Sequence, residues 1–506
     1  MLREPTASRH IPYSAQVSET VVKTFAGDYV QSFRLAGVSF ESADDETLNN
    51  WHERLNVTLR NIASPNLALW THVVRRRERT VPGAFSGDGF ADRLARRYHE
   101  RLAGETLMVN ELYLSIVYRP VAGAVSGLAS KLIVRRAGPS ATAELADALE
   151  ACGKLRETLA AALSRYEPEA LGLEMRNGRT YSRLLEFFAQ LINAEYQPVP
   201  LPRAPLNEVL ATTRPLFGTE VIEYRLPTET RLGAMLGIKE YPTPTFVGLY
   251  NALLSAPFPF VLTQSFAFLT KATAQGLLQR QSARMANAGD FAVTQAAELN
   301  DALDALTGNE FVMGDHHFTL QVLAEEAPIE RGEPETGRVK FLNDAIAQAR
   351  AYLADTGMTV AREDLGLEAG TWAQLPGNFG YRTRKSPITS RNFAAMSAFH
   401  DYPSGRATGN HWGEALAPFV TRAWSAFHFS LHASDPADPE GGSRKDTGHT
   451  FVCGPTGSGK TVLIGFLIAM LARRGVTQVI FDKDRGLEIL VRALGGVYLP
   501  LRNGQP

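Results

Sequence analysis

The sequence has little cysteine, almost no net charge and no long hydrophobic run, and each shortage excludes a class of protein. Its two cysteines, Cys152 and Cys453, are too few for a disulfide framework and fit a reducing cytosol. Lys and Arg total 52 against 53 for Asp and Glu, so the net charge is −1 and supplies no general attraction to DNA or lipid. We therefore expect a globular protein of ordinary composition.

No segment has the profile of a signal peptide or of a membrane span. Residues 1–22 are polar and interrupted by charges. Residues 253–269 are the most apolar long stretch, but they contain two prolines and Gln264 and fall short of the roughly 20 residues that a spanning helix needs. We expect a buried strand there, preceded by a turn, and a core helix at residues 462–471. Any membrane association is expected to come through partners or a surface.

Apolar patterning alternates between strand-like and helix-like segments, and a length of 506 residues suggests two to four domains. Apolar residues at spacings of three and four predict a helix over residues 48–62, with Ser42 as a candidate N-cap. We expect strands at residues 29–40, 67–74, 111–118, 220–226, 231–238 and 318–323, and helices at 91–102, 142–166, 181–194, 271–306 and 341–353. This alternation predicts a mixed α/β fold.

Residues 454–461 read Gly-Pro-Thr-Gly-Ser-Gly-Lys-Thr and match the phosphate-loop pattern G-x-x-x-x-G-K-[ST], or Walker A. Glycines let consecutive backbone N–H groups face a phosphate, and the helix that follows offers its positive N-terminus. Lys460 is expected to neutralise the β- and γ-phosphates, and the Thr461 hydroxyl to ligate Mg²⁺. The predicted nucleotide site comprises Gly454, Pro455, Thr456, Gly457, Ser458, Gly459, Lys460 and Thr461.

An acidic segment follows the next predicted strand, residues 476–481. Asp482 and Asp484 lie just after it. Because the carboxyl ends of adjacent parallel strands face the ligand, these carboxylates are candidates for approaching the nucleotide or its metal. They are equally compatible with a charged turn that caps a helix starting near Gly486, and spacing alone does not decide between the two.

Two changes in composition predict the domain boundaries. Four prolines fall between residues 198 and 205, and Gly and Pro concentrate at residues 401–413. We therefore predict an N-terminal α/β subdomain at residues 1–200 and a second part of the same N-terminal domain at residues 201–405. Residues 406–506 are predicted to begin a RecA-like P-loop domain, in which residues 419–432 and 449–453 form a hairpin with a long loop.

The C-terminal third of the chain carries several further short motifs in a fixed order. They are Ala-Gln-Leu-Pro-Gly-Asn at 373–378, Ser-Arg-Asn-Phe-Ala at 390–394, Phe-His-Asp-Tyr-Pro at 399–403, Gly-Asn-His-Trp-Gly at 409–413, Gly-His-Thr at 448–450, Phe-Asp-Lys-Asp-Arg-Gly at 481–486 and Arg-Ala-Leu-Gly-Gly at 492–496. With the phosphate loop among them, residues 372–506 resemble the type IV secretion and conjugation ATPases grouped as CagE, TrbE and VirB. The middle of the chain resembles the N-terminal domain of that family more loosely.

The resemblance implies an ATP-hydrolysing motor at the cytoplasmic face of the bacterial inner membrane, which powers pilus biogenesis by extracting pilin and powers substrate transfer. It also implies a hexameric or dimer-based homo-oligomer, an N-terminal domain that docks to inner-membrane channel components and other secretion ATPases, and DNA as a possible substrate. Carried over to this sequence, Gly454, Gly459, Lys460 and Thr461 bind ATP and Mg²⁺. Asp482 lies in a family motif, and its chemical role does not follow from the residues.

The chain departs from the family pattern after the loop. Only 46 residues follow Lys460, whereas a RecA-like motor needs roughly two more strand–helix repeats of about 30 residues each. An acidic Walker B strand and an arginine finger are not among them, so we expect poor nucleotide binding and negligible hydrolysis. The chain is then either a piece of a longer ATPase or a non-hydrolysing scaffold of the secretion channel. A DNA-translocating ATPase of the coupling, FtsK or HerA type is disfavoured, because those proteins lack the motifs at 373–378 and 410–413.

Two smaller features complete the sequence-based expectations. Basic residues concentrate in one region. They could contact anionic lipid or DNA. The near-neutral net charge favours the other interpretation, in which they form a solvated face or a docking edge for a partner. They are Arg75, Arg76, Arg77, Arg79, Arg93, Arg96 and Arg97. Cys453 precedes the phosphate loop in a predicted strand and is expected to be buried and inert.

Overall fold

The computed structural model describes residues 6–78, 87–120, 140–226, 230–287, 293–324, 336–410, 413–432 and 448–500. The chain divides into two compact units. The first comprises Met1–Arg76 and Asn110–Tyr402, and the second comprises Arg77–Val109 and Pro403–Pro506. An early segment of the chain therefore belongs to the same unit as the phosphate loop.

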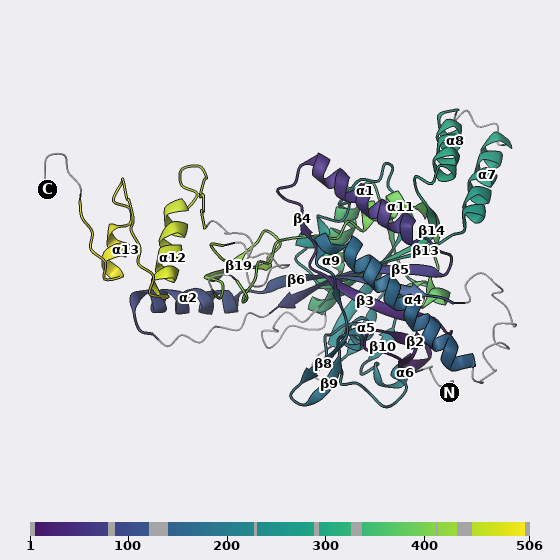
Figure 1. The fold of residues 1–506 in the computed structure, drawn as a ribbon, viewed down its shortest axis with the longest axis horizontal. Helices are drawn as coiled ribbons and strands as arrows, with labels where there is room; N and C mark the ends of the chain where they lie inside the picture. The colour runs from purple at the N-terminus through teal and green to yellow at the C-terminus, as the bar shows by residue number, and fades with distance from the viewer. Residues whose placement is uncertain are drawn as a thin grey trace. The chain divides into compact units, whose positions relative to one another are not determined.

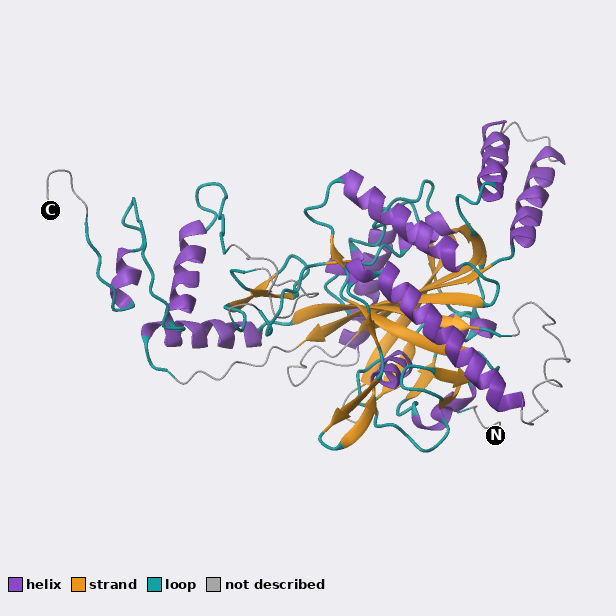
Figure 2. Ribbon diagram, in the orientation of Figure 1, coloured by secondary structure: helices purple, strands orange, loops and turns teal. Residues whose placement is uncertain are grey.

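A large antiparallel sheet forms the framework of the first unit (Figures 1 and 2). Its strands are β1 (Tyr13–Gln16), β2 (Val22–Thr24), β3 (Tyr29–Leu35), β5 (Leu67–Glu78), β6 (Leu107–Tyr118), β7 (Glu169–Ala170), β10 (Arg214–Phe217), β11 (Ile222–Arg225), β12 (Thr230–Glu240), β13 (Phe260–Phe268), β14 (Met313–Ala324), β15 (Thr359–Arg362) and β16 (Ser386–Thr389). They are ordered β1-β2-β3-β6-β5-β13-β14-β12-β11-β10, with β7 beside β3, β15 beside β12 and β16 beside β14. Two small pairs, β4 (Val38–Ser39) with β17 (His400–Asp401) and β8 (Leu173–Arg176) with β9 (Arg179–Ser182), lie outside this sheet.

Helices cover both faces of the sheet. They are α1 (Asp45–Ile62), α4 (Ser140–Ala162), α5 (Arg183–Asn193), α6 (Leu206–Val209), α7 (Lys271–Asn287), α8 (Val293–Thr307), α9 (Thr336–Ala354), α10 (Leu367–Ala373) and α11 (Ser390–Met396). One core cluster contains side chains of α1, α4, α9 and α11, and the other contains side chains of α5, α6 and α10. Figure 1 shows α1, α4 and α9 lying across the strands, while α7 and α8 form a hairpin that extends from β13 and β14.

Central strands of the sheet are apolar on both sides because both sides are covered. In β5, Leu67 and Leu69 belong to one core cluster, whereas Trp70 and Val74 belong to the other. Successive side chains of a strand point to opposite faces, so a strand covered on both faces loses the usual alternation of apolar and polar residues. The same reason accounts for the nearly continuous burial of β13, which confirms the buried strand and preceding turn predicted within residues 253–269.

Several predicted elements are confirmed, and one helix cap is wrong. The mixed α/β fold class and the predicted strands and helices of the first unit are present, except that residues 271–306 contain two helices, α7 and α8, instead of one, and the strand predicted over residues 29–40 ends at Leu35. The N-cap of α1 is Asp44 rather than Ser42, since the Asp44 carboxylate accepts a hydrogen bond of 2.8 Å from the amide of Thr47. A carboxylate at this position also favours the positive end of the helix dipole, which explains the preference over a serine two residues earlier.

The compact units differ from the predicted parts 1–200, 201–405 and 406–506. Strands from both of the first two parts pair within a single sheet, since β13 contacts β5 on one side and β14 on the other. The proline-rich segment at 198–205 therefore connects two parts of one unit. The composition of this segment predicts a turn-rich connection. Strand pairing is needed to show whether the two parts that it connects belong to one compact unit or to two.

The second unit is small, and its described strands form a single hairpin. Its elements are α2 (Phe90–Gly104), β18 (Ala417–Val420), β19 (Ala426–Phe429), α12 (Lys460–Ala472) and α13 (Glu488–Ala493). The predicted hairpin between residues 419–432 and 449–453 is wrong, because the chain turns back within residues 421–425 and β18 pairs with β19. Residues 433–447, the predicted long loop, lie outside the described residues.

The strands predicted on either side of the phosphate loop are not formed. Residues 449–453 and 476–481 have no strand pairing in the described part of the chain. A β-strand depends on hydrogen bonds to a neighbouring strand, so a suitable apolar sequence alone does not produce one. Among the helices that the structure describes, none combines the length and apolar character that a bilayer crossing requires.

Candidate nucleotide site

The phosphate loop of the second unit has the backbone that its glycines permit. Gly457 and Gly459 have φ angles of +85° and +87°, in the left-handed region that disfavours side chains. Gly459 is the N-cap of α12, which begins at Lys460. The first amides of the helix have no acceptor within it, so they are available to an anion placed at the end of the loop.

Lys460 folds back over the loop. Its Nζ donates hydrogen bonds to the carbonyl oxygens of Gly454 and Pro455, at 2.7 and 2.9 Å. Gly454 itself is tightly placed, since a Cβ on it would lie 2.8 Å from the Ser458 hydroxyl. The lysine ammonium therefore lies over a loop of small residues, where a phosphate group would replace the carbonyls as its partner. The residues present fit a nucleotide phosphate.

The segment of residues 482–486 lies beside the start of α12. A Cβ built on Gly486 would lie 3.4 Å from the Thr461 methyl carbon, which places this segment next to the residue predicted to ligate Mg²⁺. Spacing along the chain did not predict this proximity. Thr461 is exposed to solvent.

Asp482 has two hydrogen-bond partners in this structure. Its Oδ2 accepts from the amide of Leu487 at 2.8 Å and from the hydroxyl of Tyr498 at 3.3 Å. Desolvation raises the pKa of Tyr498, and the Asp482 carboxylate raises it further, so the hydroxyl remains protonated and donates. Leu487 directly precedes α13, so this carboxylate bonds to the turn that leads into the helix. Asp484 is exposed.

Large apolar side chains around the loop are exposed. Phe451 and Phe481 are 89% and 91% exposed, and Val479 is similarly open. Cys453 is exposed as well, so the prediction that it is buried was wrong. The prediction assumed a strand at residues 449–453, and without that strand no neighbouring element covers the thiol.

The predicted basic concentration divides into residues with different roles. Arg75 is 1% exposed and donates to the carbonyl oxygen of Ala256, and Arg76 pairs with the buried carboxylate of Glu111 at 2.9 Å. Arg75 is therefore internal and Arg76 is partly buried, which the solvated-face interpretation did not foresee. Arg93 and Arg96 donate to backbone carbonyls of the preceding turn. Arg79 lies outside the described residues.

The short motifs at 373–378 and 390–394 are structural parts of the first unit. Gln374 is fully buried; its side chain donates to the Gln321 side chain at 3.0 Å, and its carbonyl bonds to the ring of His72. Asn378 donates to the carbonyls of His10 and Trp372, which closes the turn. These contacts tie the turn at residues 373–378 to the sheet.

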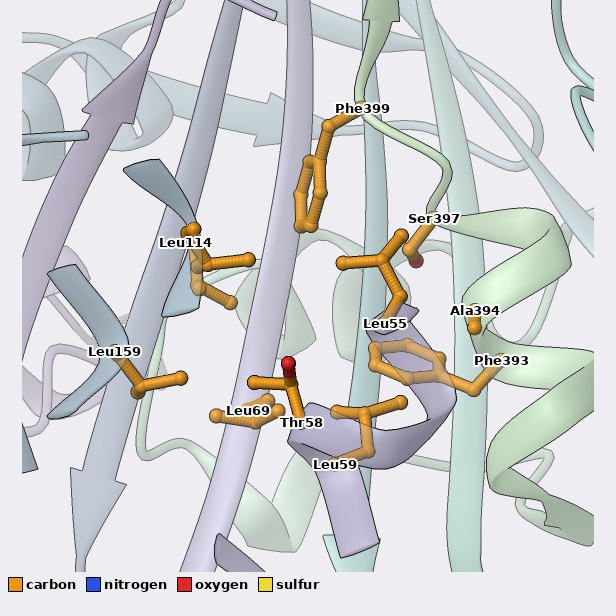
Figure 3. Close-up of a pocket in the computed structure, with 11 residues that line it drawn as sticks. Leu55, Thr58, Leu59, Leu69, Leu114, Leu159, Phe393, Ala394, Ser397 and Phe399 are labelled. Carbon is orange, nitrogen blue, oxygen red and sulfur yellow. The ribbon is translucent and has the colours of Figure 1, made fainter. Parts of the chain in front are cut away.

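An enclosed cavity also lies in the first unit, and its chemistry argues against a ligand site. Its volume is about 20 Å³, and apolar side chains from α1, α4, α11 and the sheet line it (Figure 3). Leu55, Leu59, Leu69 and Phe393 point into it. A void of this size is a packing defect, since its lining side chains are apolar apart from the hydroxyl groups of Thr58 and Ser397.

Comparison with known proteins adds evidence from residues outside the loop. The model of the CagE, TrbE, VirB family, described as a component of type IV transporter system, matches residues 169–384. The model of the N-terminal domain of the type IV secretion system ATPase VirB4/TrbE matches residues 20–125. Both matches end before the phosphate loop begins, so they are independent of it.

Curated relatives match along the whole chain. The type IV secretion system protein virB4 of Bartonella quintana is 40% identical over 100% of this chain and 62% of its own length. The type IV secretion system protein PtlC of Bordetella pertussis is 36% identical over 99% of this chain and 60% of its own length. Protein virB4 of Agrobacterium tumefaciens is 36% identical over 99% and 61%. The chain thus spans about three fifths of the length of these relatives.

Proposed function

Because the chain belongs to the CagE, TrbE and VirB family, we propose that it is the nucleotide-binding portion of an ATPase subunit of a type IV secretion system. The observation that carries this proposal is the loop at residues 454–461, where two glycines at positive φ, an ammonium group and the start of a helix converge. The two family models match residues 20–125 and 169–384, outside the loop, so these matches and the loop support the same function independently.

The residues that hold the nucleotide follow from the loop geometry. The amides of Gly457, Gly459 and Lys460 would face the phosphates, with the Lys460 ammonium on the outer phosphates and the Thr461 hydroxyl on Mg²⁺. ATP bound there supplies the phosphoryl group whose transfer powers the machine. Asp482 accepts both of its hydrogen bonds, from the Leu487 amide and the Tyr498 hydroxyl, through Oδ2, so Oδ1 would be the oxygen that approaches the metal.

For these 506 residues alone, we propose nucleotide binding with negligible turnover. Hydrolysis requires a group that positions the attacking water and further charges that stabilise the transition state. We propose that the Asp482 carboxylate fills neither role in this arrangement, because its Oδ2 is already bonded within the turn before α13. The two alternatives, a non-hydrolysing scaffold and a motor, then differ in whether other residues supply the groups that hydrolysis needs at the nucleotide site.

The finer functions are proposed from the family. We propose that the complete subunit works at the cytoplasmic face of the inner membrane, as a hexameric or dimer-based oligomer. It would extract pilin for pilus biogenesis and would power the transfer of protein or DNA. The first unit would dock to inner-membrane channel subunits and other secretion ATPases, since its residues match the family's N-terminal domain.

A binding measurement with a fluorescent ATP analogue and Mg²⁺ tests the nucleotide site. Lys460→Ala removes a charge-assisted interaction of about 1.5–3 kcal/mol, so we expect affinity about 10- to 150-fold weaker. Lys154→Ala, which removes an exposed lysine of α4, is the matched control and should bind as the wild type does. Equal affinity of the wild type and Lys460→Ala would show that the loop is not the site.

A further inference from the structure

A groove in the second unit combines aromatic and basic side chains that the nucleotide site does not use. It has a volume of about 550 Å³ and lies between α2 and the turn that joins β18 to β19. Its lining residues include Tyr98 and Arg101 from α2 and Arg422 and Trp424 from the turn. All of them belong to the same compact unit.

The turn holds Trp424 in a conformation that tryptophan seldom adopts. Its φ is +59°, in the left-handed region, where a bulky side chain is disfavoured and where glycine is the usual residue. The Thr421 hydroxyl accepts hydrogen bonds from the amides of Ala423 and Ser425, and the Trp424 carbonyl accepts one from the Met108 amide. The surrounding bonds therefore fix an unfavourable backbone at this residue.

The fixed turn presents the indole to solvent. Trp424 is 54% exposed, and its ring makes no aromatic or cation–π contact within the described ranges. In contrast, Tyr98 forms the floor of the groove, since its hydroxyl donates to the Pro418 carbonyl at 2.7 Å and its ring packs on Phe466. A strained, exposed tryptophan contributes nothing visible to the core, so its side chain is available for a ligand.

Two arginines and one glutamate line the groove around this indole, so its charged side chains carry a net positive charge. The Arg422 side chain is exposed and has no hydrogen bond or ion pair with any residue that the structure describes. The Arg101 side chain is 83% exposed and forms an ion pair with Glu105 at 3.5 Å. Arg97, one helical turn before Arg101, is also exposed, so two arginines extend the positive charge along α2.

We propose that this groove binds single-stranded nucleic acid, with a base stacked on Trp424 and backbone phosphates on Arg101 and Arg422. Flat aromatic platforms within positively charged grooves bind unpaired bases without requiring a particular sequence. A duplex keeps its bases stacked on each other and offers the indole no free face. A lipid bilayer is broad and flat, and a concave site with a recessed aromatic floor fits a single strand better.

The test uses the full chain and a fluorescein-labelled 20-nucleotide oligothymidylate, followed by fluorescence anisotropy without ATP. Trp424→Gly should bind about 5- to 100-fold more weakly, while Trp424→Phe keeps most of the affinity. Arg101→Gln and Arg422→Gln should each weaken binding and reduce the slope of log affinity against log salt by about 0.7. Arg280→Gln, an exposed arginine of α7, is the matched control and should change neither quantity.

The glycine variant separates a ligand role from a structural role. Glycine tolerates positive φ, so Trp424→Gly should keep or raise the melting temperature while it loses binding. A lower melting temperature together with unchanged binding would overturn the proposal. So would wild-type protein that binds the oligonucleotide no more tightly than Trp424→Gly does.

Three further outcomes would assign the groove to another ligand. Recruitment to phosphatidylglycerol vesicles that depends on Trp424, with no binding of the oligonucleotide, would make it a membrane contact. Equal affinity for duplex DNA would exclude stacking on the indole. Displacement of the oligonucleotide by an equal concentration of ATP would indicate a mononucleotide site. Because the oligonucleotide assay contains no ATP, an absence of oligonucleotide binding would not contradict the proposed ATP site. Likewise, an absence of ATP binding would not contradict the proposed nucleic-acid groove.

Discussion

The contribution of Asp401 to the stability of the first unit should fall as pH rises, because its carboxyl group is held in a buried hydrogen-bonded network. Its Oδ1 accepts from the Asn110 side chain at 2.9 Å and from the Tyr402 amide at 2.8 Å. Arg75 donates to the Asn110 side chain at 2.8 Å, and Arg34 adds positive charge nearby. Burial nevertheless dominates these favourable contacts and raises the pKa of Asp401 to about 7.

The sign and size of the effect follow from proton linkage. An unfolded aspartate has a pKa of about 3.9, so between pH 4 and pH 7 the folded protein retains a proton that the unfolded chain releases. Stability from the protonated form is complete at low pH and is lost as pH rises, by about 1.4 kcal/mol per unit. Between pH 5 and pH 8 the loss should reach about 3 kcal/mol.

Asp401→Asn removes this dependence. The asparagine keeps an oxygen that accepts the same hydrogen bonds, but it cannot ionise. Melting temperatures of the variant and the wild type, measured from pH 5 to pH 8, should therefore diverge in favour of the variant by about 3–4 °C for a unit of this size. Asp355→Asn, which changes an exposed carboxylate after α9, is the control. A difference between Asp401→Asn and the wild type that stays constant with pH, or that shrinks as pH rises, would refute the reasoning.

Three core substitutions probe packing. Gly314→Ala should destabilise by about 1–3 kcal/mol, because a Cβ there would lie 2.6 Å from the buried ring of Phe266. Leu69→Ala should cost about 3–5 kcal/mol, since it enlarges a cavity that already exists. Ser390→Ala should cost about 1–3 kcal/mol, because the serine hydroxyl bonds to the buried side chain of Asn56 at 2.6 Å. Chemical denaturation followed by far-UV circular dichroism measures all three.

Matched substitutions in open positions serve as controls for these three. Gly276→Ala in α7 meets no atom within 4 Å, and Leu201→Ala removes an exposed leucine. Neither should destabilise by more than about 0.5 kcal/mol. If Gly314→Ala or Leu69→Ala proved as mild as its control, the close packing described around the sheet would be incorrect.

The phosphate loop could be predicted from the sequence because its conformation depends on residues that are close together in the chain. The loop requires positive φ at Gly457 and Gly459 and a helix that begins at Lys460, and each requirement is met by neighbours a few residues away. Helix periodicity is equally local, which is why residues 48–62 were correctly predicted as helix. The buried strand β13 was also predictable, because most of its residues are apolar, as is typical of a strand covered on both faces.

The roles of residues whose partners lie far away in the sequence could not be predicted from the sequence. Gln374 bonds to Gln321 and His72, which are far away in the sequence, so the motif around it looked like isolated turn chemistry. Asp401 likewise depends on Asn110 and gives no local sign of its burial. Proximity of Gly486 to Thr461 arises from packing and could not be read from their separation along the chain.

By itself, then, the sequence determined the class of fold, the phosphate loop and the family resemblance, because these rest on residue types and short spacings. Tertiary structure decided that residues 77–109 join the C-terminal unit, that Arg75 is buried, and that residues 449–453 and 476–481 are not paired strands. The physical reason is common to all three. Burial and strand pairing depend on two segments that contact each other, so the sequence of one segment alone does not determine them.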